Sequence, residues 1–424
     1  MNDPRGSIWR KCDFHVHTPL SALENNFTTD FDEYVKCLFK KAIEKRIFVI
    51  GITDYFTIEG YKKIRTEYLE KEEKLRTLFT EQEIIEIKKI LILPNIEFRL
   101  NKIVQVIRKN GGQTTKETGR INFHVILSNE LSIKQMEENF LHDIYFLYES
   151  EPDEPDKRKK LKPDNLVALG SRLKMEQEGL VGSDLRVGMT HAIVNDEEIV
   201  ELLTRNKDFK EKYLIVVPSD EDLSEISWKS QDHLTRKTLL SRAHAFFSSN
   251  EKTIAFGLGE KAESTEVFVQ EFKSLKPCIW GSDAHDADKL FEPDLERYCW
   301  IKADPTFEGI RQILFEPKDR VFIGKYPELG QRIQSSRSQY LSHLSIAAVE
   351  GYDSRNGIWF DNFSLPLGFE LTAIIGNKGK GKSAVADILA LLGNAHVEAE
   401  HFSFLHTEKF CQRGYADQFQ GTLK

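Results

Sequence analysis

Short apolar runs alternate with amphipathic stretches over roughly the first 330 residues of the chain. Runs with the length and residue content of strands occupy residues 12–17, 47–53, 90–98, 121–127, 213–217 and 277–282. Between the first two runs, apolar positions from Phe31 to Ala42 recur at three- and four-residue spacing, which predicts a helix. This alternation predicts an α/β fold built on a parallel sheet or barrel.

Two segments interrupt the alternation of strands and helices. The densely charged stretch 61–90 predicts an exposed helical insertion, and the prolines and mixed charges of residues 149–164 predict a loop or a disordered insertion. After Gly324 the sequence becomes polar and serine-rich, as connectors are. We therefore expect a first domain over residues 1–325, a linker over 326–345 and a second domain over 346–424.

The composition is that of a globular protein, with 40% apolar and 30% charged residues among 424. No apolar run reaches the length of a membrane span and the N-terminus lacks an apolar signal region, so we expect a cytoplasmic protein without a membrane partner. Five scattered cysteines without a Cys-x-x-Cys pair argue against disulfides and a thiolate zinc site. The net charge of −8 argues against a nonspecific nucleic-acid coat but permits a local basic groove.

Histidine and carboxylate residues fall at the ends of the predicted strands. His15 and His17 are two residues apart on one strand, so both imidazoles point to the same face. The ligand-type residues that follow later strands are Asp54, Glu97, His124, Asp283 and His285. Each signal alone fits an ordinary surface or core residue, but the C-terminal ends of barrel strands meet at one mouth, so these residues are expected to share a pocket. Imidazole and carboxylate without thiolate suit Zn²⁺, Mn²⁺ or Fe²⁺, and Glu97 can bridge two ions.

The order of these motifs resembles that of the PHP (polymerase and histidinol phosphatase) family over residues 12–289. The shared motifs are the His-x-His pair, a Thr-Asp pair ending at Asp54, a glutamate after a strand, a mid-chain histidine and a Ser-Asp-Ala-His sequence. The resemblance implies a distorted (β/α)7-type barrel and metal-dependent hydrolysis of phosphoesters. It implies that the metal ligands are His15, His17, Glu97, His124, Asp283 and His285, with Asp54 as a catalytic or supporting acid.

The chain departs from the family pattern at two places. Tyr55 stands where the family has a histidine, and no histidine or aspartate follows His17 where three-metal members place one. We therefore expect two divalent ions, with Tyr55 at the catalytic site as a hydrogen-bond partner of substrate or ligand. A further family histidine has no clean match: His191 is our first candidate ligand, while His233 and His244 also fit ordinary structural histidines.

The second predicted domain carries a phosphate-binding loop. A strand-like run, residues 371–375, precedes Gly376-x4-Gly381-Lys382-Ser383, and a helix with spaced apolar residues follows as far as Gly393. Such loops bind ATP with Mg²⁺: backbone N–H groups wrap the phosphates, the lysine contacts the β and γ oxygens and the serine holds the metal. The predicted ATP-binding residues are Gly376, Asn377, Gly379, Lys380, Gly381, Lys382 and Ser383.

The form GNKGKGKS resembles the loop of SMC and ABC ATPases, although Lys378 stands where that family has asparagine. The whole chain is similar to PHP-SMC fusions of the TrlF type. That resemblance implies a nucleic-acid partner, a homo-oligomer formed through the ATPase half and a role in antiphage defence. Neither an LSGGQ-like signature nor an aliphatic run ending in Asp-Glu follows the loop, so we expect residues 346–424 to be the N-terminal segment of a longer ATPase domain.

Three functions remain open at this point. The first is a nuclease that cuts DNA or RNA under control of the ATPase half. The second is a small-molecule phosphatase of the histidinol-phosphatase type. The third is a nucleotide-sensing module with weak catalysis, which the tyrosine at position 55 suggests.

Overall fold

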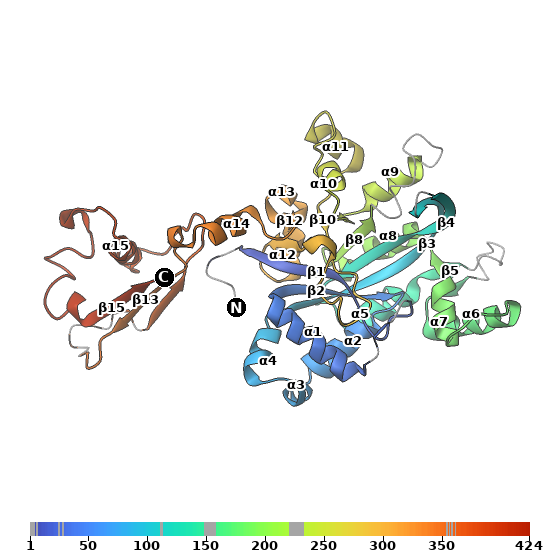
Figure 1. The fold of residues 1–424 in the computed structure, drawn as a ribbon, viewed down its shortest axis with the longest axis horizontal. Helices are drawn as coiled ribbons and strands as arrows, with labels where there is room; N and C mark the ends of the chain where they lie inside the picture. The colour runs from blue at the N-terminus through green and yellow to red at the C-terminus, as the bar shows by residue number, and fades with distance from the viewer. Residues whose placement is uncertain are drawn as a thin grey trace. The chain divides into compact units, whose positions relative to one another are not determined.

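The computed structural model describes residues 5, 7–23, 26–27, 29–110, 113–147, 158–219, 233–352, 355, 357, 359–360 and 362–424. The chain forms two compact units. The larger unit is Trp9–Pro327, and the smaller one joins residues 1–8 to residues 328–424. Figure 1 labels the helices and strands of both units.

A sheet of twelve strands forms the centre of the larger unit, in the order β10-β9-β8-β4-β3-β2-β1-β11-β12, with β5, β6 and β7 attached beside β3. The strands are β1 (Trp9–His17), β2 (Ile47–Tyr55), β3 (Leu91–Asn110), β4 (Gln113–Leu127), β5 (Tyr145–Leu147), β6 (Lys159–Lys160), β7 (Ile193–Val194), β8 (Tyr213–Pro218), β9 (Ala245–Phe247), β10 (Cys278–Ile279), β11 (Cys299–Lys302) and β12 (Val321–Ile323). The predicted strands therefore lie in one sheet, and the fold is mixed α/β.

The two halves of β1 have different neighbours on one side. Its first half pairs with β11 in the antiparallel sense. Its second half meets the segment after β10, where Asp283 N donates to His15 O at 2.9 Å and His17 N donates to Ala284 O at 3.1 Å. The sheet thus curves back on itself into a nearly closed, barrel-like form, which brings the first strand of the chain against residues almost 270 positions later.

Strands β3 and β4 form a long antiparallel hairpin, which the expectation of a parallel sheet did not include. The neighbours β1 and β2, β2 and β3, β8 and β9, and β9 and β10 are parallel as expected, whereas β4 runs against both β3 and β8. The physical reason is local: the connection between β3 and β4 is too short for the crossover that a parallel pair needs.

Helices cover the outer face of this sheet (Figure 1). They are α1 (Phe31–Lys45), α2 (Glu59–Lys63), α3 (Glu72–Leu78), α4 (Glu81–Ile87), α5 (Ile133–Glu138), α6 (Pro163–Glu176), α7 (Asp184–His191), α8 (Asp196–Arg205), α9 (His233–Arg242), α10 (Glu251–Gly257), α11 (Thr265–Phe272), α12 (Phe307–Arg311) and α13 (Pro317–Arg320). The predicted helix after β1 is confirmed as α1. Its N-cap is Asp30, whose carboxylate accepts from Glu33 N, and it buries the expected apolar face.

The charged segment 61–90 is helical, but the expectation that it is an exposed insertion is wrong. Tyr61, Ile64, Tyr68 and Leu75 are all at most 2% exposed and belong to the same apolar core as the sheet. Charged residues occupy the opposite face of these short helices, so a count of charges along the sequence hid their amphipathic character.

The smaller unit contains a three-stranded antiparallel sheet in the order β14-β13-β15 and two helices. These elements are β13 (His343–Ala348), β14 (Phe363–Pro366), β15 (Phe419–Leu423), α14 (Glu328–Ser335) and α15 (Lys382–Leu392). The strand expected at residues 371–375 is not formed, and Leu371 and Ile375 are 99% and 89% exposed. A complete ATPase domain is therefore not what this unit shows.

Part of the predicted loop at 149–164 lies outside the described residues, and its described end carries β6 and the start of α6. Over the ranges that the structure describes, none of the helices combines the length and the apolar character needed to cross a membrane.

Candidate metal centre

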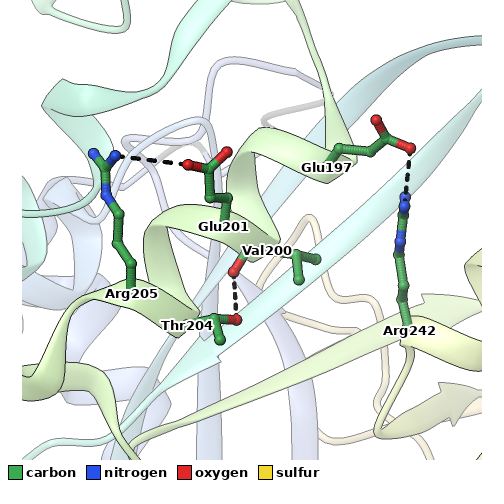
Figure 2. Close-up of a pocket in the computed structure, with 6 residues that line it drawn as sticks. All are labelled: Glu197, Val200, Glu201, Thr204, Arg205 and Arg242. Atoms are coloured by element: carbon green, nitrogen blue, oxygen red, sulfur yellow. Dashed lines mark hydrogen bonds and ion pairs between the residues drawn. The ribbon is translucent and has the colours of Figure 1, made fainter.

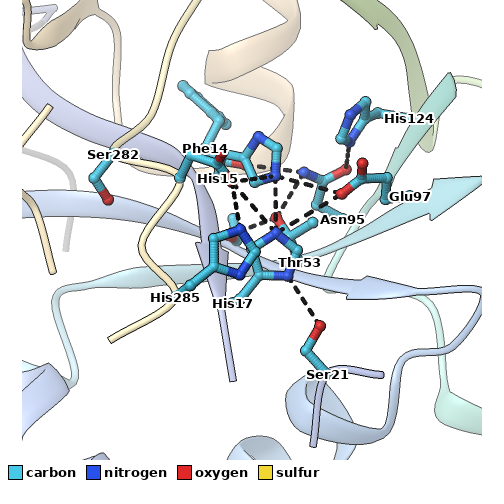
Figure 3. Close-up of polar contacts among 12 residues, drawn as sticks. Phe14, His15, His17, Ser21, Thr53, Asn95, Glu97, His124, Ser282 and His285 are labelled. Atoms are coloured by element: carbon cyan, nitrogen blue, oxygen red, sulfur yellow. Dashed lines mark hydrogen bonds and ion pairs between the residues drawn. The ribbon is translucent and has the colours of Figure 1, made fainter. Parts of the chain in front are cut away.

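Six residues from β1, β3, β4 and the segment after β10 come together at one place in the barrel-like unit. We name them the ligand cluster: His15 and His17 on β1, Glu97 on β3, His124 on β4, and Asp283 and His285 after β10. His15 Nε2 lies 3.1 Å from His17 Nε2, 3.1 Å from Asp283 Oδ1 and 3.5 Å from Glu97 Oε2. His285 Nε2 lies 3.3 Å from Asp283 Oδ1. Figure 3 shows the side chains of the other five members, His15, His17, Glu97, His124 and His285, brought together from separate segments of the chain.

Within the cluster, two overlapping triplets have ligand atoms close enough to share an ion. They are His15 with Glu97 and His124, and His15 with His17 and Asp283. In each triplet the candidate ligand atoms all lie within 4.8 Å of one another. Imidazole and carboxylate groups at such separations are the donor set that transition metals take in catalytic sites.

Asn95 fixes the orientation of His124. The amide nitrogen of Asn95 donates to Phe14 O at 3.0 Å and to Thr53 Oγ1 at 2.8 Å. Because a carbonyl oxygen can only accept, this places Asn95 Oδ1 on the other side, 3.2 Å from His124 Nδ1. His124 Nδ1 therefore carries the proton, and Nε2 keeps a free lone pair, as a metal ligand requires.

His17 is held from several sides at the end of β1. Its Nδ1 lies 3.1 Å from Ser21 Oγ, and its backbone carbonyl accepts from the hydroxyl of Tyr34 at 2.9 Å. Its ring stacks on that of His285, with centroids 4.1 Å apart, and on that of Tyr55, with centroids 5.1 Å apart. The hydrogen bond at Nδ1 leaves Nε2 as the atom that faces the rest of the cluster.

The charges within the cluster shift the pKa values of its members in opposite directions. Burial opposes ionisation of Glu97, yet the neighbouring His124 and His15 lower its pKa to about 2. Burial also disfavours the charged form of His15, but Asp283 and Glu97 raise its pKa to about 9. Without a metal ion, a protonated His15 thus supplies the positive charge that the two carboxylates need.

Burial and the nearby charges act on the remaining members too. Burial lowers the pKa of His124 to about 3, so this imidazole is neutral at physiological pH. Burial opposes ionisation of Asp283, but His15 and His17 hold its pKa well below the usual range. The Asp283 side chain is 58% exposed, so water screens this last effect.

One atom of the cluster tests directly whether an ion fits. Oε2 of Glu97 is buried, and no described residue offers it a hydrogen bond. An ionised oxygen without a hydrogen bond in a buried place is costly, because its lost hydration is not replaced. A divalent cation among the imidazoles would satisfy this oxygen, so the residues present fit a metal ion.

Asp13 ties β1 to the segment that carries Asp283. Its buried carboxylate accepts from Ser282 N at 3.0 and 3.1 Å and from His15 N at 3.1 Å. Burial raises its pKa to about 6, although the bonds to Ser282 act against this. Gly281 permits the close approach, since a Cβ there would lie 2.4 Å from His15 N. The ligand residues of both segments are therefore held in register by backbone contacts.

Asp54 does not join the ligand cluster. Thr18 Oγ1 and Gly60 N each donate to one of its carboxylate oxygens at 2.9 Å, and burial raises its pKa to about 7. Both oxygens therefore connect Thr18, directly after β1, and α2 to β2, which is the geometry of a supporting acid. Tyr55, in contrast, borders the cluster through its stacking on His17.

Among the described residues, His191 belongs to neither triplet of candidate ligand atoms, so the structure gives no support to its prediction as a metal ligand. Its side chain is exposed at the end of α7, and its Nδ1 lies 2.8 Å from Val187 O. His244 lies at the opposite end of β9 from the cluster, where its Nδ1 accepts from Ile215 N. The side chain of His233 lies outside the described residues.

The predicted phosphate-binding loop lies in the smaller unit. Gly376, Gly379 and Gly381 all have positive φ angles, and α15 begins directly after the loop. Lys382 Nζ donates to Gly376 O at 2.8 Å and to Asn377 O at 3.0 Å. A cavity of about 570 Å³ adjoins the loop, and its lining residues are Trp359, Phe360, Gly379, Lys380, Gly381, Lys382, Ser383, Ala384, Ser403 and Phe404.

A second cavity, of about 350 Å³, lies over α8 and beside Arg242 (Figure 2). Its charged residues are paired with one another: Arg205 lies 3.7 Å from Glu201, and Arg242 lies 2.9 Å from Glu197. No ligand-type cluster of described residues lies in it, so we assign it no chemistry.

Several residues that shape the centre have no sequence signal of their own. Asn95, Asp13 and Ser21 act through ligand residues, and Phe247 closes one side, with its ring 4.7 Å from that of His124. The position of Asn95, two residues before Glu97 on the same strand face, could have been found from strand alternation. The partners of Asp13 and Ser21 depend on chain reversals that no short-range pattern reveals.

Comparison with known proteins finds solved structures with a weak likeness to this chain. No known protein family matches this chain, and no curated protein is similar to it. PsfC from Pseudomonas syringae PB-5123 is 12% identical, with 78% of this chain and 97% of that one covered and a TM-score of 0.31. A protein described as a metal-dependent phosphoesterase, from Bifidobacterium adolescentis ATCC 15703, is 12% identical over 67% and 95%, with a TM-score of 0.28.

Such scores mark only a general likeness. The structure of this chain by itself defines a mixed α/β protein with a nearly closed barrel-like sheet. Its cluster of histidine and carboxylate groups could hold a metal ion.

Proposed function

We propose that the chain is a metal-dependent phosphoester hydrolase and that the ligand cluster is its active site. The observation that carries the proposal is the buried Oε2 of Glu97, which lacks a hydrogen bond although it lies 3.5 Å from His15 Nε2 and 3.7 Å from His17 Nε2. The resemblance of the motif order to the PHP family supports the same reaction. The metal-binding residues are then His15, His17, Glu97, His124, Asp283 and His285.

Two divalent transition metal ions, Mn²⁺, Zn²⁺ or Fe²⁺, fit this set better than one. Six ligand residues exceed what a single catalytic ion takes from a protein. Two triplets overlap at His15, and one imidazole nitrogen binds only one ion, so the bridging role falls to a carboxylate. Glu97 would be the shared carboxylate, because it belongs to the first triplet and its Oε2 also lies 3.7 Å from His17 Nε2 of the second.

Bound divalent ions supply Lewis acidity and lower the pKa of water, which is the chemistry that phosphoester hydrolysis needs. Other residues of the chain orient the ligand side chains and enclose the cluster. Asn95 holds His124 with its Nε2 lone pair facing inward, and Asp13 keeps the Asp283 segment against β1. Phe247 excludes water from one side of the cluster, and Tyr55 offers its hydroxyl as a hydrogen-bond donor to substrate.

We propose DNA or RNA as the substrate, in preference to a small phosphomonoester. The support is the similarity of the whole chain to PHP-SMC fusions, whose ATPase half acts on nucleic acids. A nucleotide-sensing role without turnover is the remaining alternative.

Binding of ATP with Mg²⁺ is a second proposed activity, at the loop Gly376–Ser383. The observation in its favour is the cavity of about 570 Å³ that the loop residues line. Regulation of the hydrolase by this loop, and oligomer formation through this unit, follow only from the resemblance.

The test is metal analysis combined with a cleavage panel. Purified protein would be dialysed, analysed for metals and assayed with Mn²⁺ on single-stranded DNA, RNA and 4-nitrophenyl phosphate. We expect about two transition metal ions per chain and hydrolysis that a chelator abolishes. Absence of bound metal together with absence of turnover on every substrate would refute the proposal, whereas bound metal without turnover would favour the sensing role.

A further inference from the structure

A row of polar residues continues from the ligand cluster along the β3–β4 hairpin. On β3, Asn95, Glu97 and Arg99 lie on one face, because the alternate residues Ile96, Phe98 and Leu100 are buried in the apolar core. On β4, His124, Asn122 and Arg120 likewise alternate with buried Phe123 and Ile121. The row that begins with two ligand residues therefore ends with two arginines.

The register of the hairpin brings these residues together. Glu97 lies opposite His124, and Arg99 lies opposite Asn122. Arg120 lies two residues before Asn122 on β4, beyond an irregularity in the pairing that places it opposite Ile103, and it is close enough to Arg99 for their charges to interact. A step of two residues along a strand covers about 6.6 Å, so the arginines lie one to two steps, about 7 to 13 Å, from the cluster.

Arg99 and Arg120 are held near each other in a partly buried place. Both side chains are half-buried, and Arg99 NH1 donates to Thr190 O at 3.0 Å. Burial lowers the pKa of Arg120, and the positive charge of Arg99 lowers it further. Two like charges at close range repel each other, and both attract an anion that approaches them.

We propose that Arg99, Arg120 and Asn122 bind a phosphate of the substrate that is not the one being hydrolysed. The inference rests on the proposed function and names the substrate class: a chain of phosphodiesters, that is, an oligonucleotide. Phosphates along one strand are spaced about 3.4 Å along the helix axis, so this subsite lies a few phosphates away from the reacting one. Guanidinium groups bind phosphate through two parallel hydrogen bonds, and the Asn122 amide can add a third donor.

A purely structural role for Arg99 makes a different prediction. If Arg99 only ties β3 to the end of α7 through Thr190 O, its loss would weaken the fold and lower turnover of every substrate alike. A phosphate subsite lowers turnover selectively, because only a substrate with further phosphates reaches it.

The experiment compares two substrates with Mn²⁺: bis(4-nitrophenyl) phosphate, which has one phosphodiester, and a single-stranded DNA 12-mer. The variants are Arg99→Gln/Arg120→Gln and, as a matched control, Arg205→Gln, which removes an arginine that pairs with Glu201 over the α8 cavity. For the double variant we expect kcat/KM on the 12-mer to fall about a hundredfold, mostly through KM, because each arginine makes a charge-assisted hydrogen bond. The loss on the one-phosphate substrate should be at least tenfold smaller, and the control should resemble the unchanged protein on both.

Salt dependence gives an independent readout. If two phosphate contacts are lost, the slope of log kcat/KM for the 12-mer against log salt should become shallower by about 1.4, or about 0.7 for each contact. Arg99→Lys/Arg120→Lys keeps the charges and should retain most of the slope while losing the paired hydrogen bonds.

Several results would overturn the inference. Equal losses on both substrates, or an unchanged salt slope, would show that the arginines serve the fold alone. Hydrolysis of the one-phosphate substrate by the unchanged protein, but of neither the DNA 12-mer nor an RNA 12-mer, would refute the substrate class. No hydrolysis of any of the three substrates, together with no bound metal, would instead refute the proposed function. If thermal unfolding shows that the double variant is not folded, Arg120→Gln alone decides, since Arg120 does not carry the bond to Thr190.

Discussion

The two units differ in how firmly the surrounding structure holds their functional residues in place. In the barrel-like unit, each ligand residue lies on or directly after a strand, and buried polar partners such as Asn95 and Asp13 hold the ligand segments in place. In the smaller unit, the phosphate-binding loop has the expected residues and glycine conformations, but the run before it forms no strand. A motif in sequence therefore shows which groups are present, whereas the surrounding packing decides whether they are held ready.

Lys382 illustrates this difference. Its ammonium group bonds two carbonyl oxygens of its own loop, so it must give up those bonds to contact a phosphate. In the ligand cluster, His124 is already in position, because its Nδ1 donates to Asn95 Oδ1 and this bond directs Nε2 inward. Preorganisation of this kind lowers the free energy that binding must spend on ordering.

Loss of a cluster carboxylate should have the largest effect. We expect Asp283→Asn to lower metal-dependent hydrolysis at least about a thousandfold, because it removes a charged ligand while asparagine tolerates the positive φ of 51° at this position. Hydrolysis rates, metal content and circular dichroism would be measured together. The control is Asp288→Asn on the exposed surface of the same segment. Turnover and metal content equal to those of the unchanged protein would remove Asp283 from the site.

Metal affinity of the cluster should increase with pH. Below its pKa of about 9, His15 is protonated, and this proton must leave before Nε2 can bind an ion. The apparent affinity for Zn²⁺ should thus rise by up to about tenfold per pH unit between pH 7 and 9 and level off above. Competition with a fluorescent chelator, corrected for the chelator's own protonation, measures this. A flat profile across the window would mean that His15 is not a ligand.

Nucleotide binding by the smaller unit should be weak. We expect ATP to bind with a Kd above about 0.1 mM, corresponding to roughly 5 kcal/mol, because the loop lacks a paired strand before it. Lys382→Ala should remove this binding and leave hydrolysis at the ligand cluster unchanged. Isothermal calorimetry would measure ATP binding. The control is Lys409→Ala, since Lys409 also donates a hydrogen bond to a backbone carbonyl in this unit. Tight binding would show that the loop is ordered despite its exposed flank.

The smallest effect should come from the exposed run before the loop. Ile375 is 89% exposed, so Ile375→Ala should change the free energy of unfolding by less than about 0.5 kcal/mol. The matched change Ile96→Ala, at a fully buried position of β3, should cost about 2 to 5 kcal/mol. Guanidinium unfolding followed by fluorescence compares the two. A cost above 1 kcal/mol at Ile375 would show that this side chain is packed in solution.

Much of the sheet was predictable because its strands are short apolar runs with clear ends. The helix α1 followed from its apolar spacing, and the meeting of the ligand residues followed from strand-end geometry. The direction of β4 did not, because apolar runs carry no information about whether a strand is parallel or antiparallel. His124 reaches the cluster from a strand that runs opposite to β1 and β3, which carry His15, His17 and Glu97, so its location depended on a hairpin that was not foreseen.

The errors have physical causes as well. His191 was the first candidate for a family histidine that has no clean match in this sequence, but its side chain is exposed and its ring lies within hydrogen-bond distance of Val187 O on its own helix. The burial of Tyr61 and Tyr68 was missed because charged neighbours dominate the local composition. Neither error could be corrected without knowing which face each helix turns to the core.

The closure of the sheet has a consequence for synthesis of the protein. His17 and His285 stack on each other, yet about 270 residues separate them along the chain. At 5 to 20 residues per second, a ribosome needs roughly 15 to 50 s to proceed from one to the other.

During that time the nascent chain displays the His15 and His17 pair without the carboxylate and imidazole that complete the cluster. Contacts between such distant residues also slow folding, because a long loop must close before they form. The ligand set can thus be complete only late in synthesis, after nearly all of the barrel-like unit has left the ribosome.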